Sequence, residues 1–184
     1  MERPIIGPAD RSGAGPWGII RLMAACRVRA EPLAKGGLDL MMYQGEPVDL
    51  ESAEVVVAIG AGVRSEADFR LVQHLAECLG AAIAGTRPAV DRGFIRHEQM
   101  IGQTGRTVRP GLYIAIGISG SMQHRTGVAE TAKVIAINSD PKAPIFSVAD
   151  HAIIGDLHDV IPRMMAAVRC GATVEQIVES TARV

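Results

Sequence analysis

Glycine, serine and histidine residues follow directly on an apolar run in the stretch GLYIAIGISGSMQH, residues 111–124. The order Gly117, Ser119, Ser121 invites comparison with the hydrolase nucleophile elbow G-x-S-x-G, whose strained turn needs a glycine two positions to either side of the serine. Ser121 stands at the second glycine position, and His124 lies too close in sequence to be a standard triad partner. A turn from a strand into a helix, which can also approach an anion or a cofactor, explains the stretch better than a nucleophilic serine.

Two other glycine-containing loops are candidates for ligand binding. Residues 60–62 read Gly-Ala-Gly after an apolar run, but Ser65 replaces the third glycine of the dinucleotide fingerprint G-x-G-x-x-G. The segment MIGQTGRT, residues 100–107, places Gln103 and Thr104 between two glycines. This segment is either a plain turn or a loop whose backbone approaches a planar ligand while Thr104 donates a hydrogen bond.

A third group of residues is acidic and histidine-rich and comprises Asp150, His151, Asp156, His158 and Asp159. Their spacing matches no zinc or calcium pattern, and they straddle a predicted strand and a predicted helix. We interpret them as solvated residues at the start of a helix, with Asp156 as its N-cap, and expect no metal site.

Composition restricts the class of protein further. The chain has 184 residues, of which 48% are hydrophobic and 21% charged, and its formal net charge is -1. These values are typical of a globular domain and argue against broad electrostatic binding to nucleic acid or to an anionic membrane. The three cysteines, Cys26, Cys78 and Cys170, form no CxxC pair, which favours a reducing cytoplasm over a disulfide framework. The apolar stretch at residues 17–26 is too short to span a bilayer, and we expect no membrane insertion.

The positioning elements alternate between strands and helices. Continuous apolar runs, typical of parallel strands covered on both faces, predict strands at 54–60, 81–85, 112–117, 133–138 and 151–155, with a further candidate at 37–44. An apolar stripe between Ser65 as N-cap and Gly80 as C-terminal stop predicts a helix after the first of these runs.

A second helix is predicted after Asp156, and a capping box from Thr173 to Gln176 begins a last one. The alternation predicts an α/β fold: a doubly wound, mainly parallel sheet sandwiched by helices, as in Rossmann-like FAD- or NAD-binding domains. In such sheets ligands bind beyond the carboxyl ends of the strands. We divide the chain into an unassigned, partly irregular extension (1–50), a cofactor-binding domain (51–170) and a carboxy-terminal helix (171–184).

Three separated blocks make the sequence recognisable: GTRPAVDRGF at 85–94, IGQTGRTVRPGLYIAIGISGSMQH at 101–124, and KVIAINSDPKAPIFSVADHAIIGDL at 133–157. In order and spacing they resemble the carboxy-terminal, FAD-binding domain of the electron-transfer flavoprotein α subunit. The resemblance runs from about residue 52 to about residue 168. It implies a parallel sheet between helices, with an FAD held along the strand ends.

The resemblance also implies roles for individual residues near the flavin. Arg87 is expected to approach the isoalloxazine, with Thr86 beside it, and Gln103 and Thr104 to lie near the ring edge that carries N5. His124 is expected at the N1–C2=O edge, where an added electron places negative charge that a cation stabilises. The remaining cofactor-binding residues implied are Ile101, Gly102, Ser119, Gly120, Ser121, Met122 and Gln123 in the two loops, and Asn138, Asp156 and Leu157 towards the adenosine end.

The implied function is that of an electron carrier rather than of a catalyst with its own substrate: it shuttles electrons between a dehydrogenase and an acceptor. The alternative is a structural or regulatory module that binds FAD, or AMP alone, without carrying electrons. Two departures favour the alternative, because Ala61 stands where the family commonly has arginine and Met100 where a glutamine is usual. The family's amino-terminal domain is not recognisable in residues 1–50, so the expected partners are a β-type subunit or a second copy of the chain, besides redox proteins.

Overall fold

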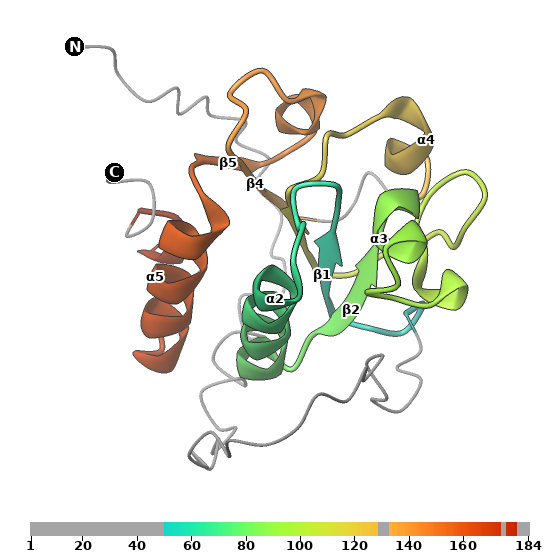
Figure 1. Ribbon diagram of the computed structural model, residues 1–184. Helices are drawn as coiled ribbons and strands as arrows, with labels where there is room; N and C mark the ends of the chain where they lie inside the picture. The colour runs from blue at the N-terminus through green and yellow to red at the C-terminus, as the bar shows by residue number, and fades with distance from the viewer. Residues whose placement is uncertain (1–49, 129–132, 174–175, 180–184) are drawn as a thin grey trace.

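The computed structural model describes residues 50–128, 133–173 and 176–179 (Figure 1). Its centre is a parallel sheet of five strands in the order β2-β1-β3-β4-β5. The strands are β1 (Val55–Ile59), β2 (Ala82–Gly85), β3 (Leu112–Ile116), β4 (Lys133–Asn138) and β5 (His151–Ile154). All five strands predicted between residues 54 and 155 are confirmed to within one residue at either end. The predicted α/β fold with a doubly wound parallel sheet is therefore confirmed.

The two faces of the sheet are covered differently. Helices α2 (Glu66–Leu79) and α5 (Leu157–Arg169) lie side by side on one face, as Figure 1 shows, and pack on alternate strand residues such as Val57 and Ile114. The intervening residues, such as Ala58 and Tyr113, face a second core cluster closed by loop residues. Because both faces are covered, every residue of β1, β2 and β3 is buried, and this explains their continuous apolar sequence.

The ends of the long helices follow from local sequence. The Ser65 side chain accepts a hydrogen bond from Asp68 N–H and closes a capping box at the start of α2, while Gly80 ends this helix at φ 60°. Asp156 caps α5 by accepting from His158 N–H, as predicted. The capping box from Thr173 to Gln176 is also present. The apolar stretch at 17–26, the strand predicted at 37–44 and part of the carboxy-terminal helix predicted at 171–184 lie outside the described residues.

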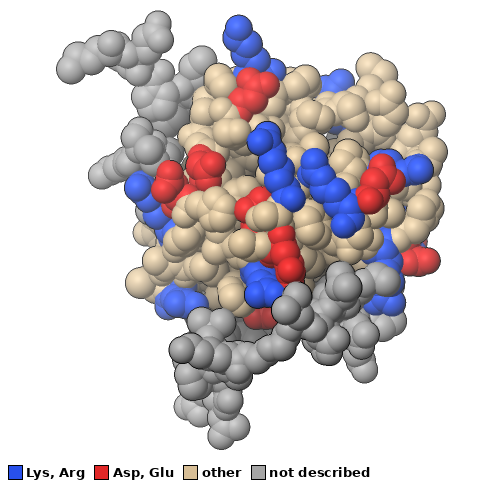
Figure 2. Space-filling view, viewed as in Figure 1, with Lys and Arg blue, Asp and Glu red and all other residues tan. Residues whose placement is uncertain are grey.

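Short elements occupy the crossovers near the site. They are α3 (Arg87–Asp91), α4 (Met122–Arg125) and the 3-10 helices η1 (His97–Gln99) and η2 (Pro144–Ser147). Figure 2 shows basic and acidic side chains interspersed over the viewed face rather than separated into patches of one sign. Within the described part of the chain, no helix is long and apolar enough to cross a membrane.

Candidate functional site

The topological switch point of the sheet lies between β1 and β3, because the crossovers from these neighbouring strands run in opposite directions along the sheet. The loops that leave the two strands touch through their backbones: Gly60 N–H donates to Ile116 C=O at 3.0 Å and Gly62 N–H to Gly117 C=O at 2.9 Å. A Cβ atom on Gly62 would stand 2.6 Å from the Cα of Gly117. The two glycines are therefore required here for close approach rather than for a dinucleotide fingerprint.

A crevice of about 180 Å³ opens beside this contact. Its walls come from the carboxyl ends of β1, β3, β4 and β5, and include Gly62, Gly117, Asn138, Gly155 and Leu157. Pockets that enclose a drug-sized ligand usually exceed about 300 Å³. The crevice can therefore enclose only part of a large cofactor, and the remainder would lie against the surface outside it.

Two of the predicted adenosine-end residues, Asn138 and Asp156, form hydrogen bonds with backbone groups at this crevice. The Asn138 side-chain amide donates to Ile118 C=O at 2.9 Å, and its oxygen accepts from Asp140 N–H at 2.9 Å. Asp156 is occupied as the cap of α5, where it accepts from His158 N–H at 2.8 Å. Both residues line the crevice, and they also fix the loops that shape it.

A contact between Asp68 and His158 joins the starts of α2 and α5 at the crevice. Oδ2 of Asp68 accepts from the backbone N–H groups of Arg64 at 2.8 Å and Ser65 at 3.0 Å, while Oδ1 lies 3.0 Å from Nε2 of His158. Burial raises the pKa of Asp68, but the hydrogen bonds from Arg64, Ser65 and His158 outweigh it and lower the pKa to about 2. Asp68 is therefore ionised at neutral pH and holds the two helix starts together.

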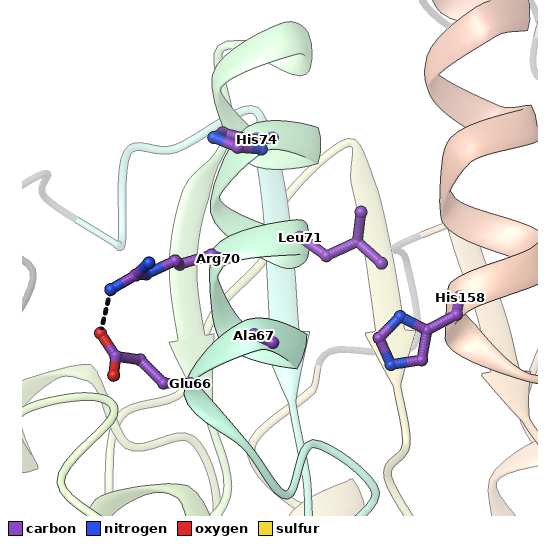
Figure 3. A pocket seen from close by; sticks show the side chains of 6 residues that line it. All are labelled: Glu66, Ala67, Arg70, Leu71, His74 and His158. Atoms are coloured by element: carbon purple, nitrogen blue, oxygen red, sulfur yellow. Dashed lines mark hydrogen bonds and ion pairs between the residues drawn. The ribbon is translucent and has the colours of Figure 1, made fainter. Parts of the chain in front are cut away.

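Sequence reasoning missed the contact between Asp68 and His158, because the two residues are separated by 90 positions. Figure 3 shows His158 projecting from α5 towards α2, on the outer side of which Glu66 and Arg70 form an ion pair at 2.5 Å. A wide surface groove of about 520 Å³ lies along α2 and is lined also by Leu71, His74 and His158. It is more open to the surface than the crevice.

The loops after β2 and β3 form a polar ledge beside the switch point. Loop 101–106 is joined to β2 by Ile101 N–H, which donates to Gly85 C=O at 2.9 Å, and to α4 by Gln103 N–H, which donates to Gln123 C=O at 2.8 Å. Gly102, at φ 140°, is needed for this approach, since a Cβ atom there would stand 2.8 Å from the Gln123 carbonyl oxygen. We call the exposed side chains of these loops the ledge residues: Gln103, Thr104, Ser119, Ser121 and Gln123.

The ledge residues carry amide and hydroxyl groups that make no side-chain hydrogen bond with any other residue that the structure describes. They are therefore available to a ligand. Neutral donors and acceptors of this kind suit a heterocycle that alternates ring nitrogens and carbonyl groups, such as a flavin. Among the described residues, no group of three or more His, Cys, Asp or Glu is placed to hold a metal ion.

A buried hydrogen-bond network supports the ledge from beneath. His124 is only 4% exposed, with Nδ1 3.3 Å from the Ile101 carbonyl oxygen and Nε2 2.9 Å from the hydroxyl of Tyr113. Since a carbonyl can only accept, Nδ1 carries the proton, and the Tyr113 hydroxyl donates to Nε2. Burial lowers the pKa of His124, against a smaller opposing effect of the Ile101 hydrogen bond, and burial raises the pKa of Tyr113. His124 is therefore a neutral imidazole that ties β3 to loop 101–106.

This network also bears on the hydrolase alternative. Both ring nitrogens of His124 are occupied by Tyr113 and Ile101, so His124 has no free position from which to deprotonate Ser119. Ser119 itself is an exposed residue of the turn, and its carbonyl accepts from Ile145 N–H at 2.9 Å. The structure thus agrees with a strand-to-helix turn at this position and does not assemble a nucleophile with a base.

The other predicted site residues flank the ledge. Thr86 precedes α3 and its hydroxyl lies 3.4 Å from the Ile59 carbonyl oxygen, while Arg87 pairs through Nε with Asp91 at 2.9 Å on the exposed side of α3. Gly120 adopts φ 82° because its backbone packs on Ile145, where a Cβ atom would stand 2.3 Å from N. Met122, the first residue of α4, is 69% exposed.

Comparison with known proteins identifies a matching family and several similar proteins. Residues 49–129 match the family model described as the electron transfer flavoprotein FAD-binding domain. Among curated proteins, Protein FixB of Clostridium saccharobutylicum is 44% identical over 129 residues, which cover 70% of this chain and 39% of that protein. The mitochondrial electron transfer flavoprotein subunit alpha of Dictyostelium discoideum is 43% identical over 126 residues, covering 68% of this chain and 36% of that protein.

A third relative is subunit LctC of the lactate dehydrogenase (NAD(+),ferredoxin) of Acetobacterium woodii, 38% identical over 153 residues, which cover 83% of this chain and 36% of that subunit. The chain thus spans between 36% and 39% of the length of these three relatives.

Proposed function

Because the chain belongs, through residues 49–129, to the electron transfer flavoprotein FAD-binding domain family, we propose that it binds FAD at the carboxyl ends of its strands and carries electrons from a dehydrogenase to an acceptor. The ledge residues are the observation that carries this proposal. Their side-chain amides and hydroxyls have no hydrogen-bond partner among the described residues, and they lie near the crevice at the switch point where doubly wound folds bind nucleotides. A bound FAD supplies the electron chemistry, and the protein then needs no general acid or base of its own.

Each region of the site receives one part of the cofactor in this proposal. The crevice, with Asn138, Asp156 and Leu157 in its walls, receives the adenosine end, since its volume suits a part of the cofactor only. The flavin ring lies across the ledge residues, where Gln103 and Thr104 donate to the edge that carries N5. Ile101, Gly102, Gly120 and Met122 shape the two loops that carry the ledge residues.

Charge at the flavin comes from Arg87 rather than from His124. The ion pair between Arg87 and Asp91 is exposed on both sides, and exposed pairs of this kind are worth only about 0–1 kcal/mol. The guanidinium can therefore turn from Asp91 to a bound ring at little cost, with Thr86 beside it. His124 lies beneath the ledge, towards the N1–C2=O edge, as a neutral group, because its burial disfavours a second ring proton.

The test is the absorption spectrum of the purified chain before and after incubation with FAD, with the released cofactor identified by mass. We expect a flavin spectrum, and a Thr104→Val variant should bind FAD about tenfold more weakly, as for the loss of one hydrogen bond of about 1.4 kcal/mol. Thr107→Val is the matched control, since Thr107 is also exposed and directly follows this loop but is not a ledge residue. A protein that stays colourless at high FAD concentration overturns the proposal.

The alternative of a structural or regulatory module rests on the small volume of the crevice, which suits AMP alone as well as one end of FAD. Met100, at the position where a glutamine is usual, is 2% exposed and belongs to the core rather than to the ledge. Two measurements separate the readings. Release of AMP instead of FAD, or a bound flavin that dithionite fails to reduce, favours the module over the carrier.

A partner that covers the exposed ledge is part of the proposal. Either a β-type subunit or a second copy of the chain fits the role, and redox proteins approach the same face. Light scattering of the FAD-loaded chain measures self-association directly. We propose a cytoplasmic location, which is supported by the free thiols of Cys78 and Cys170 in the described part of the chain.

A further inference from the structure

Arg92 makes an unusual pair of contacts with the loop between β1 and α2. It follows directly on α3, and its Nη1 donates to two backbone carbonyls of that loop, to Ala61 at 2.8 Å and to Val63 at 2.7 Å. These carbonyls flank Gly62, which lines the crevice. One guanidinium nitrogen therefore bonds to the residues immediately before and after Gly62, which is part of the crevice wall.

The loop is held from two opposite directions. Its amide groups bond towards β3, since Gly60 N–H donates to Ile116 and Gly62 N–H to Gly117. Arg92 approaches from the side of β2, which lies on the other side of β1 from β3 in the strand order. The crevice lies on the β3 side of the loop, where Gly62 meets Gly117 and the residues that follow β4 and β5. The carbonyls of Ala61 and Val63 are instead bonded to Arg92, which follows β2 and α3.

The direction of these carbonyls matters for an anionic ligand. A carbonyl oxygen carries partial negative charge and repels a phosphate, whereas a loop whose carbonyls are withdrawn presents its remaining groups without that repulsion. None of the ion pairs among the described residues involves Arg92, so its positive charge is directed at the two loop carbonyls. The two carboxylates in the crevice wall, Asp68 and Asp156, accept hydrogen bonds from backbone N–H groups.

We propose that Arg92 is a positioning residue for nucleotide binding: it fixes the β1–α2 loop with its carbonyls withdrawn, so that the crevice accepts the phosphate groups of a nucleotide. This inference rests on the proposed function, since it presumes a nucleotide in the crevice. It differs from the roles expected of Arg87 and His124 because Arg92 acts through the backbone of another loop and requires no contact with the ligand.

The test compares Arg92→Met and Arg92→Lys with the unchanged chain. Methionine keeps the length and apolar stem of the side chain but removes the donors, whereas lysine keeps the charge and can donate to both carbonyls. Arg109→Met is the matched control, because Arg109 is an exposed arginine that precedes the start of β3, at the opposite end of the sheet. Two quantities are measured: backbone hydrogen exchange of residues 60–64 without ligand, and the affinities for FAD and for ADP.

We expect faster exchange at residues 60–64 in Arg92→Met, and affinities for both nucleotides lower by about tenfold, the order of effect for one lost charge-assisted hydrogen bond. Arg92→Lys should restore most of both effects, and Arg109→Met should change neither. Unchanged exchange in Arg92→Met overturns the inference whether or not the chain binds a nucleotide. Faster exchange with unchanged affinities, or with lysine failing to restore them, also overturns it, because Arg92 would then only stabilise the loop. If the unchanged chain binds neither FAD nor ADP, the proposed function fails, and the role of Arg92 in binding fails with it.

Discussion

Removal of the Tyr113 hydroxyl should show how much the stability of the protein depends on both ring nitrogens of His124 having a hydrogen-bond partner. In Tyr113→Phe, Nε2 of His124 loses the donor that lies 2.9 Å away and remains buried without a partner. The other neutral tautomer does not satisfy the ring either, because Nδ1 would then face the Ile101 carbonyl oxygen without a proton to donate. A protonated ring would also fail, since its Nε2–H would have no acceptor. One unsatisfied group therefore persists in every state of the ring.

A buried polar group left without a partner costs about 1–3 kcal/mol. We therefore expect the free energy of unfolding of Tyr113→Phe to fall by about 2 kcal/mol, measured by urea denaturation followed by circular dichroism. The double variant Tyr113→Phe, His124→Leu removes both partners of the hydrogen bond, and such paired replacement by apolar groups is nearly neutral for that bond. The second substitution should therefore cost less in the phenylalanine background than in the parent chain.

The reasoning would be refuted by a loss below about 0.5 kcal/mol in the single variant, which is typical of surface substitutions. Strict additivity of the two substitutions would refute it as well, because it would show that the hydroxyl and the imidazole do not interact. An unchanged denaturant slope is needed for either comparison, since the slope reports the surface exposed on unfolding.

Three further outcomes follow from the same structure. Because burial lowers the pKa of His124, the unfolded chain takes up a proton below about pH 6.5 that the folded chain resists, so stability should fall as pH drops below this value, and His124→Leu should flatten the decline in urea titrations. The lowered pKa of Asp68, from 3.8 to about 2, gives about 2 kcal/mol that is complete above pH 4 and lost as pH falls towards 2; Asp68→Asn should remove this acid dependence in calorimetry. Gly117→Ala should destabilise the chain by more than Gly80→Ala, although both glycines adopt φ 60°, because a Cβ atom at Gly117 would meet Gly62 at 2.7 Å whereas at Gly80 nothing lies within 4 Å. Equal losses of thermal stability in the two alanine variants would contradict the close approach of the loops.

The strands and helices of this fold are predictable from the sequence where short-range patterns, such as apolar runs and helix caps, mark them. The five strands are identifiable from continuous apolar runs, and the start of α2 from the capping box at Ser65. These signals act over a few residues, and the parallel arrangement then follows from the alternation of strands and helices. The switch point follows less directly, because Gly62 and Gly117 resemble parts of ligand-binding motifs, whereas in the structure they bring two loops into contact.

The site is less predictable, because its pairings join distant segments. No local pattern indicates that His124 bonds to Tyr113, and the charge of the imidazole cannot be decided without the burial that only the fold provides. The partnership of Asp68 with His158 depends on α2 and α5 lying side by side. The loop exposure of Gln103 and Thr104 agrees with a site at the strand ends, whereas their contact with a cofactor stays a prediction.

In the proposed function, the exposure of the ledge residues has a consequence for the timing of electron transfer. Because Gln103, Thr104 and Ser119 are exposed, a ring bound on them would have one face open to the medium whenever no partner covers the ledge. An electron held there can pass quickly to a docked protein, but it can equally be taken by dissolved dioxygen. Enclosed sites avoid such losses by excluding the surroundings. On an open ledge the protection is kinetic: the useful acceptor must arrive before dioxygen does, so the lifetime of the stored electron depends on how fast partners associate and leave.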